Sequence, residues 1–180
     1  MAKGAATGFL AVLGVGASLF VSPDVEGAFG ATLALTALAI ALVDAREQII
    51  PDGFALAAFA LGVAAIVAAF GRDALEPLLD ALERAAAMAA SFWAFRAGYR
   101  AMRGREGMGL GDVKLAAVAG IWLEWGQLPI AVEIAALSAL ATVLGRRWAL
   151  KEPIDPLARL PFGAFFAPAI WLTWWAWRWA

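Results

Sequence analysis

Long apolar segments alternate with short charged ones along the whole chain. A helix needs about 20 apolar residues to cross the ~30 Å hydrocarbon core of a bilayer, and about 17 are tolerated. The pattern predicts an all-α, polytopic transmembrane bundle of about seven spans, with six or eight as alternatives, in one domain over residues 1–180. The expected spans are Ala5–Val21, Ala28–Val43, Phe54–Phe70, Leu82–Ala97, Val113–Trp125, Pro129–Leu144 and Phe162–Trp179.

The first apolar segment has one feature of a secretory signal, because Lys3 precedes it. No clear small-x-small cleavage pattern follows the apolar run. We therefore expect this segment to remain as the first span. At the other end of the chain, the cluster Trp171, Trp174, Trp175, Trp177 and Trp179 predicts an aromatic belt at a membrane interface.

Composition supports the same class of protein. The chain is 63% hydrophobic and 16% charged, whereas a soluble domain carries roughly 25% charged residues. The mean hydropathy is +0.78. The formal net charge is -1 and the basic residues form no continuous groove, so we expect a lipid bilayer as the environment and no nucleic-acid partner.

The chain contains neither cysteine nor histidine. Disulfides, thiol nucleophiles, Ser-His dyads and His-Glu-x-x-His zinc sites are thereby excluded. We expect no metal and no cofactor. Carboxylate chemistry is the strongest option that remains.

The basic residues predict an orientation. If the N-terminus is cytoplasmic, Arg72, Arg84 and Arg178 fall on the outer side. Every other Lys and Arg, including Lys151 and Arg159, falls on the cytoplasmic side. The positive-inside rule favours this arrangement. It places Asp44, at the end of the second span, and Asp112, at the start of the fifth, at the same membrane face.

Two aspartates at membrane depth are the main candidates for chemistry. Ionisable groups there are costly and usually face a protein interior or an aqueous cavity. A pair of carboxylates brought together can share a proton and activate water. Each residue also has a simpler interpretation: Asp44 as an interfacial partner of Arg46, and Asp112 as a helix N-cap behind a flexible loop.

The residues around the aspartates have a physical use. Gly107, Gly109 and Gly111 allow a positive φ or a close approach of another chain segment. Lys114 lies within a turn of Asp112, where it either tunes the charge of the pair or extends to lipid headgroups, and Arg46 has the same ambiguity. Pro51 suits the first turn of the third span.

Three motifs resemble those of type IV prepilin peptidases, which are membrane aspartic proteases. The run Gly109-Leu110-Gly111-Asp112-Val113-Lys114-Leu115 resembles their Gly-x-Gly-Asp signature. The segment from Asp44 to Pro51 and Asp52 resembles their first motif, an Asp followed by a hydrophobic-Pro-Asn/Asp corner. Leu160-Pro161-Phe162-Gly163 resembles their Pro-Phe-Gly turn. The chain departs from the family pattern at Ala164, where Pro is common, and at Glu124, where Gly is common.

The resemblance implies an aspartic endopeptidase in the bacterial cytoplasmic membrane, with its active site toward the cytoplasm. Its substrates would be prepilin-like proteins with a basic leader, a Gly at the cut and an apolar helix. Asp44 and Asp112 would be catalytic, and the supporting residues would be Arg46, Pro51, Asp52, Gly109, Gly111, Lys114, Pro161 and Gly163. Without cysteines for the zinc-binding domain linked to N-methylation, the chain is similar to the compact, peptidase-only enzymes of tight-adherence (Flp) pili.

Three alternatives remain open from the sequence. A presenilin-type intramembrane protease shares Gly-x-Gly-Asp, but its first Asp usually follows Tyr, whereas Asp44 follows Val43. A proton-coupled transporter would use Asp44, Asp112 and Glu133 as a relay. A non-catalytic assembly factor would keep the fold alone. The sequence predicts no oligomeric state.

Overall fold

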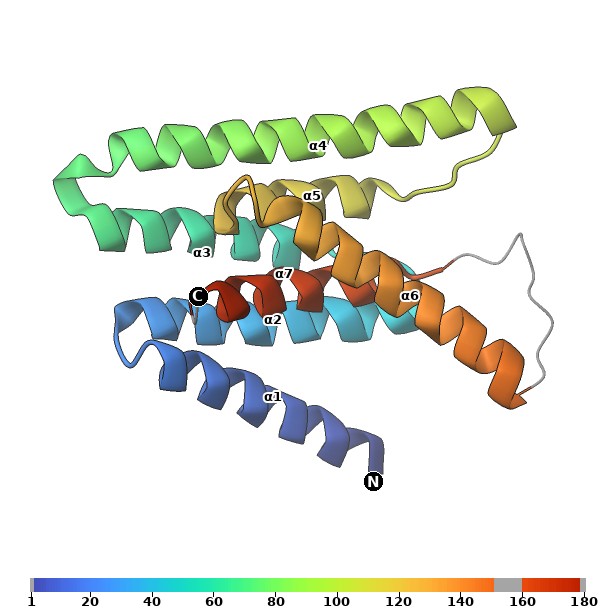
Figure 1. The fold of residues 1–180 in the computed structure, drawn as a ribbon, viewed down its shortest axis with the longest axis horizontal. Helices are drawn as coiled ribbons and strands as arrows, with labels where there is room; N and C mark the ends of the chain where they lie inside the picture. Colours follow the sequence, from blue (N-terminus) through green and yellow to red (C-terminus); the bar gives the residue numbers. More distant parts are fainter. Residues whose placement is uncertain (1, 151–159, 179–180) are drawn as a thin grey trace.

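The computed structural model of the chain describes residues 2–150 and 160–178. These residues form seven α-helices and one 3-10 turn (Figure 1). Lys151, Arg159 and Trp179, which entered the predictions above, lie outside this part. The helices are α1 (Ala2–Val21), α2 (Val25–Glu47), α3 (Asp52–Phe70), α4 (Leu75–Arg103), α5 (Leu110–Trp122), α6 (Leu128–Leu150) and α7 (Gly163–Trp177), and the 3-10 turn η1 (Gly71–Asp73) joins α3 to α4.

The predicted all-α fold is confirmed, and each predicted span corresponds to one helix. Four helices, α1, α2, α3 and α6, are long and apolar enough to cross a membrane. Helix α4 has 29 residues but carries charges near both ends. Helices α5 and α7 have 13 and 15 residues. At 1.5 Å per residue they extend about 20 Å, which is shorter than a ~30 Å hydrocarbon core.

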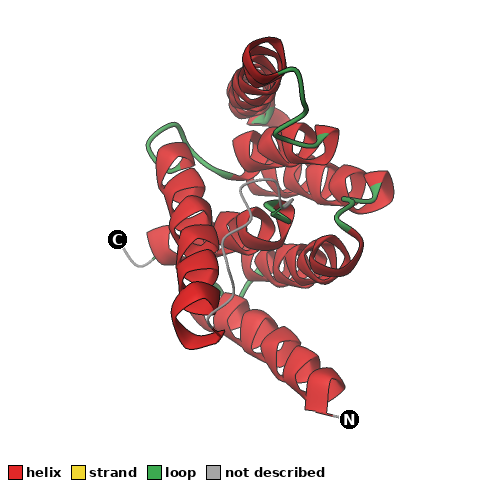
Figure 2. Ribbon diagram, turned by 90° about the vertical axis from the view of Figure 1, so that its right-hand side faces the viewer, coloured by secondary structure: helices red, strands yellow, loops and turns green. Residues whose placement is uncertain are grey.

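The two short helices lie inside the bundle, where they supply much of its core. Leu115 and Val118 of α5 pack with Phe166 and Ile170 of α7, and all four side chains are almost completely buried. Phe92 of α4 stacks on Phe166 with 5.4 Å between ring centroids. The longer helices surround this core (Figures 1 and 2).

Three tryptophans of α7 contact α1 or α2, while Trp177 at its end is exposed. Trp171 Nε1 donates to Ser18 Oγ at 3.0 Å, and Trp175 Nε1 donates to the carbonyl of Ala17 at 3.2 Å. Trp174 is buried against α2 at Gly30. The predicted aromatic belt is therefore wrong for Trp174, whose ring is buried against α2, whereas Trp171 and Trp175 are partly exposed and bond to α1.

The two ends of the bundle hold different helix ends and connections. Figure 1 shows the C-terminal ends of α2 and α4 and the N-terminal ends of α3, α5 and α7 at one end. We call this the aspartate end, since it holds Asp44 and Asp112. The α1–α2, α3–α4 and α5–α6 connections lie at the opposite end.

Helices α4 and α5 approach each other most closely at Gly120. A Cβ atom there would lie 2.4 Å from the backbone of Ala85. Next to this contact the buried Arg84 donates from Nε to the carbonyl of Gly120 at 3.2 Å. Its guanidinium also pairs with Asp80 and, at 3.0 Å, with Glu124. The unusual Glu124 thus joins the α5–α6 connection to α4.

This close approach makes the two helices sensitive to one methyl group. We expect Gly120→Ala to destabilise the protein by about 1–3 kcal/mol, because the clash is with backbone that cannot rotate away. Gly98→Ala on α4 is the matched control, since a Cβ there meets nothing within 4 Å. It should raise stability by about 0.5–1 kcal/mol. Thermal unfolding of both variants in one detergent measures the difference, and a shift of the same sign in both would contradict the packing described.

Candidate active site

Asp44 lies in the last turn of α2 and is only 5% exposed. Its Oδ2 accepts a hydrogen bond from the backbone N–H of Ala164 at 2.8 Å. Ala164 belongs to the first turn of α7, and the residue that precedes this helix, Phe162, provides no side-chain cap. Asp44 therefore caps α7 from another helix, and the positive end of the α7 dipole faces its carboxylate.

Asp112 lies in the first turn of α5 and is 8% exposed. Its Oδ2 accepts a hydrogen bond from the backbone N–H of Gly109 at 3.2 Å. Gly109 is the N-cap residue and has no side chain to return a bond, so this is half of a capping box. The interpretation of Asp112 as the N-cap itself is therefore wrong by three residues.

The structure brings the two aspartates into one region. Asp112 lies within electrostatic reach of Asp44, and both belong to the aspartate end (Figure 1). Ile50, in the α2–α3 connection, lies against the backbone at Gly111, next to Asp112, and at Gly163, next to the residue that donates to Asp44. A Cβ on Gly111 would lie 2.8 Å from Ile50 Cβ, and one on Gly163 would lie 2.5 Å from Ile50 Cδ1 and 3.0 Å from Asp44 Oδ2.

Two of the three glycines around the start of α5, Gly107 and Gly111, allow close packing, and the φ angles of all three are negative or extended. The described glycines with positive φ are Gly71 and Gly104. Gly107 lies against the ring of Tyr99, and Gly111 against Ile50. The predicted close approach is thus confirmed for these two, and the predicted positive φ is wrong. Gly109 needs neither, since a Cβ there would meet Asp112 Oδ2 at an ordinary 3.5 Å.

The segment that leads to Asp112 is tied to α4. Arg96 donates from Nε to the carbonyl of Met108 at 3.1 Å and from a terminal nitrogen to Glu106 at 2.6 Å. Arg100 lies 3.5 Å from the same Glu106 carboxylate. These bonds fix the direction in which the chain enters α5. The sequence did not single out Arg96 or its pairing with Glu106, because a pairing over ten residues leaves no periodic signal.

The two cations closest in sequence to the aspartates do not pair with them. Lys114 forms its ion pair with Asp52, at the start of α3. Arg46 is exposed, and no ion pair among the described residues includes it. The interpretation of Asp44 as a partner of Arg46 is therefore wrong. Pro51 is the N-cap of α3, and Pro161 accepts from the N–H of Ala164 at 3.3 Å.

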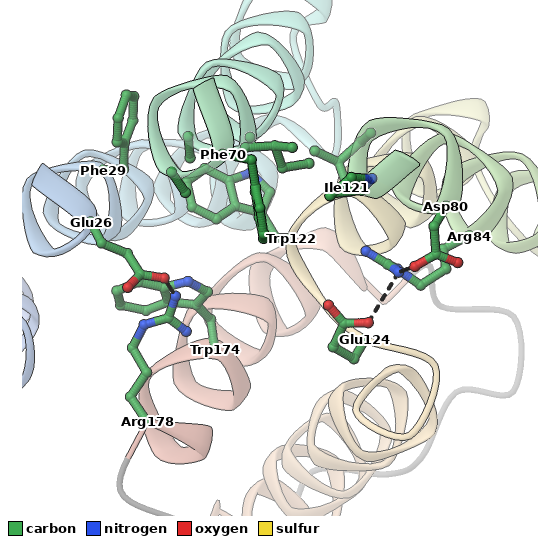
Figure 3. Close-up of a pocket in the computed structure, with 15 residues that line it drawn as sticks. Glu26, Phe29, Phe70, Asp80, Arg84, Ile121, Trp122, Glu124, Trp174 and Arg178 are labelled. Carbon is green, nitrogen blue, oxygen red and sulfur yellow. Dashed lines mark hydrogen bonds and ion pairs between the residues drawn. The ribbon is translucent and has the colours of Figure 1, made fainter. Parts of the chain in front are cut away.

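A cavity of about 250 Å³ lies at the opposite end of the bundle (Figure 3). Its polar wall contains Arg84 with its carboxylate partners and Arg178, which pairs with Glu26 and lies 4.2 Å above the ring of Trp174. Each of these arginines is paired with at least one carboxylate, and neither Asp44 nor Asp112 lines the cavity. In the described part of the chain no cluster of three or more acidic residues could hold a metal ion.

An all-helical membrane bundle with two buried aspartates at one end defines a small class of membrane proteins. The chain belongs to the type IV leader peptidase family, whose model matches residues 31–144. The matched segment contains both aspartates and the Gly-rich approach to Asp112. Pro161 and Gly163 lie beyond it. No solved structure is significantly similar to the chain.

Curated relatives agree with this family. The chain is 34% identical to a prepilin leader peptidase/N-methyltransferase of Stutzerimonas stutzeri, over 80% of the chain and 48% of the relative. It is 38% identical to that of Dickeya chrysanthemi, over 72% and 44%, and 37% identical to that of Pseudomonas aeruginosa, over 80% and 48%. The chain thus spans about half the length of the curated relatives it matches.

The capping of α7 by Asp44 can be separated from any chemistry. Asp44→Asn keeps an oxygen acceptor for the N–H of Ala164, so we expect nearly unchanged stability. Asp44→Ala leaves that N–H with only the longer, 3.3 Å bond to the carbonyl of Pro161 and should cost about 1 kcal/mol, the usual effect of losing a helix cap. Chemical unfolding measures the cost, and hydrogen exchange at the Ala164 amide locates it. Equal stability and equal protection in the two variants would contradict this role.

Proposed function

We propose that this protein is a membrane aspartic endopeptidase that removes the leader peptide of type IV prepilin-like precursors. The observation that supports the proposal is the burial of Asp44 and Asp112 at one end of the bundle, with Ile50 against the backbone next to each, within the segment that matches the leader peptidase family. The names of the relatives support the substrate class, since they are prepilin leader peptidases.

The pair has what a two-carboxylate hydrolysis requires. In this mechanism one ionised aspartate takes a proton from a water molecule, which attacks the scissile carbonyl, while the other aspartate is protonated and donates a hydrogen bond to the carbonyl oxygen. Each carboxylate is oriented by a backbone N–H, from Ala164 and from Gly109. Either aspartate can act as the base.

The glycines and prolines among the supporting residues act through the backbone, and Lys114, Asp52 and Arg46 act through their side chains. Gly111 and Gly163 leave room for Ile50, and Pro161 accepts from the N–H of Ala164, the residue that holds Asp44. Gly109 supplies the N–H that holds Asp112. Pro51 starts α3, and the Lys114–Asp52 pair joins α5 to α3. Arg46 faces outward, where it suits contact with lipid headgroups.

The aspartate end faces the cytoplasm of a bacterial inner membrane in this proposal. Arg46, Arg96, Arg100, Arg103, Arg105, Arg146 and Arg147 lie toward that end, as the positive-inside rule requires. The apolar helix of the substrate would lie along the exposed apolar faces of the bundle, and its basic leader would meet the exposed Glu47. The relay alternative gains no support, because Glu133 is exposed on α6.

The proposal is tested by cleavage of a prepilin with a basic-leader/Gly/apolar-helix junction in lipid vesicles. We expect the wild type to cut at the Gly junction. Asp44→Asn and Asp112→Asn should each lower the rate by at least about 100-fold, because each removes one half of the acid–base pair.

Glu133→Gln is the matched control, since it also neutralises one carboxylate but lies away from the pair. It should cut at the wild-type rate, whereas a relay through Glu133 would require a loss. Unfolding midpoints equal to the wild type show that the variants are folded. Undiminished cleavage by either Asp→Asn variant, or no cleavage by the wild type, would overturn the proposal.

A further inference from the structure

We infer that Ile50 is a positioning residue that sets the separation of the two aspartates. Its side chain lies between the backbone segments that carry or hold their carboxylates. The inference rests on the proposed function and gives a role to the hydrophobic residue of the Ile50-Pro51-Asp52 corner, which was not among the expected supporting residues.

The contacts of Ile50 fall next to both carboxylates. On one side it covers Gly111, the residue before Asp112: a Cβ there would lie 2.8 Å from Ile50 Cβ, 3.1 Å from Cγ1 and 3.2 Å from Cδ1. On the other side it covers Gly163, the residue before Ala164. A Cβ at Gly163 would lie 2.5 Å from Ile50 Cδ1 and 3.0 Å from Cγ1.

These contacts form a continuous path between the two acids. Asp112 follows Gly111, Ile50 joins Gly111 to Gly163, and the next residue, Ala164, donates its N–H to Asp44. Ile50 is 6% exposed. Because protein interiors are close-packed, a change in the volume of this side chain moves the segments on either side of it. A displacement of about 1 Å at a reacting group can lower a rate by about 100-fold.

The neighbouring Ile49 offers a matched control. It is the same residue type in the same connection but is 61% exposed. Ile49 and Ile50 therefore have the same side chain and differ in that only Ile50 is buried. We expect Ile50→Val to lower kcat with little change in KM for the prepilin, and to shift the pH of maximal rate, because the coupling of the two carboxylates depends on their separation. Ile49→Val should change neither.

The two glycine contacts differ in a way that allows a decisive rescue experiment. A Cβ at Gly163 clashes most closely with Ile50 Cδ1, at 2.5 Å, and lies 3.0 Å from both Ile50 Cγ1 and Asp44 Oδ2. Ile50→Ala removes the two contacts with Ile50 and leaves the one with Asp44. Gly111→Ala clashes chiefly with Ile50 Cβ, which an alanine at position 50 still has. We expect each glycine variant alone to lose about 10- to 100-fold in kcat. Adding Ile50→Ala should recover part of the activity lost in Gly163→Ala, up to the level of Ile50→Ala alone, and none of that lost in Gly111→Ala.

The unfolding midpoint and the pH–rate profile of every variant accompany the kinetics. Equal rescue of both glycine variants, rescue of neither, or an Ile50→Val variant whose losses follow its folded fraction with an unchanged pH profile, would overturn the role of Ile50. These outcomes bear on Ile50 only when the wild-type protein, assayed beside the variants, cuts prepilin. A wild type that cuts no prepilin overturns the proposed function, and this inference with it.

Discussion

The arrangement of the aspartate end depends on one constraint, the need of a buried carboxylate for a hydrogen-bond donor. Asp44 and Asp112 are both nearly inaccessible, and a buried acid without a partner is costly. Each finds its donor among the unpaired N–H groups at the start of a helix, α7 for Asp44 and α5 for Asp112. Helices α5 and α7 therefore begin near the end of α2. As a result, the α2–α3, α4–α5 and α6–α7 connections lie at the same end of the bundle.

Much of this could be predicted from the sequence, because hydropathy and charge are local signals. The apolar segments located all seven helices, and the distribution of Lys and Arg placed both aspartates at one face before any contact was known. The bond from Ala164 to Asp44 could not be predicted, since it joins residues 120 positions apart. The same holds for the Lys114–Asp52 pair and for Trp171 on Ser18, where composition suggested a lipid headgroup or an interface as the partner.

The opposite end of the bundle supports the aspartate end mechanically. At Gly120 the backbones of α4 and α5 are in direct contact, and Arg84 ties that point to Asp80 and Glu124. Arg84 is buried while Asp80 and Glu124 are exposed, so the two carboxylates compensate a buried charge and favour this arrangement of the two helices. At the other end of α4, Arg96 holds the segment that enters α5. Helix α5 is therefore fixed at both ends, and so is the carboxylate in its first turn.

The short length of α5 and α7 is itself part of how the pair is placed. In Figure 1 both helices lie within the length of α2 and α4. Their N-terminal N–H groups consequently lie inside the bundle and not at its surface. The carboxylates that accept from these groups lie at the same level along the bundle axis. A span of full length would carry its N-terminus, and with it the acid, to the membrane surface. A bundle that shortens two inner helices can hold two acids inside protein, where each is buried and has its own backbone donor.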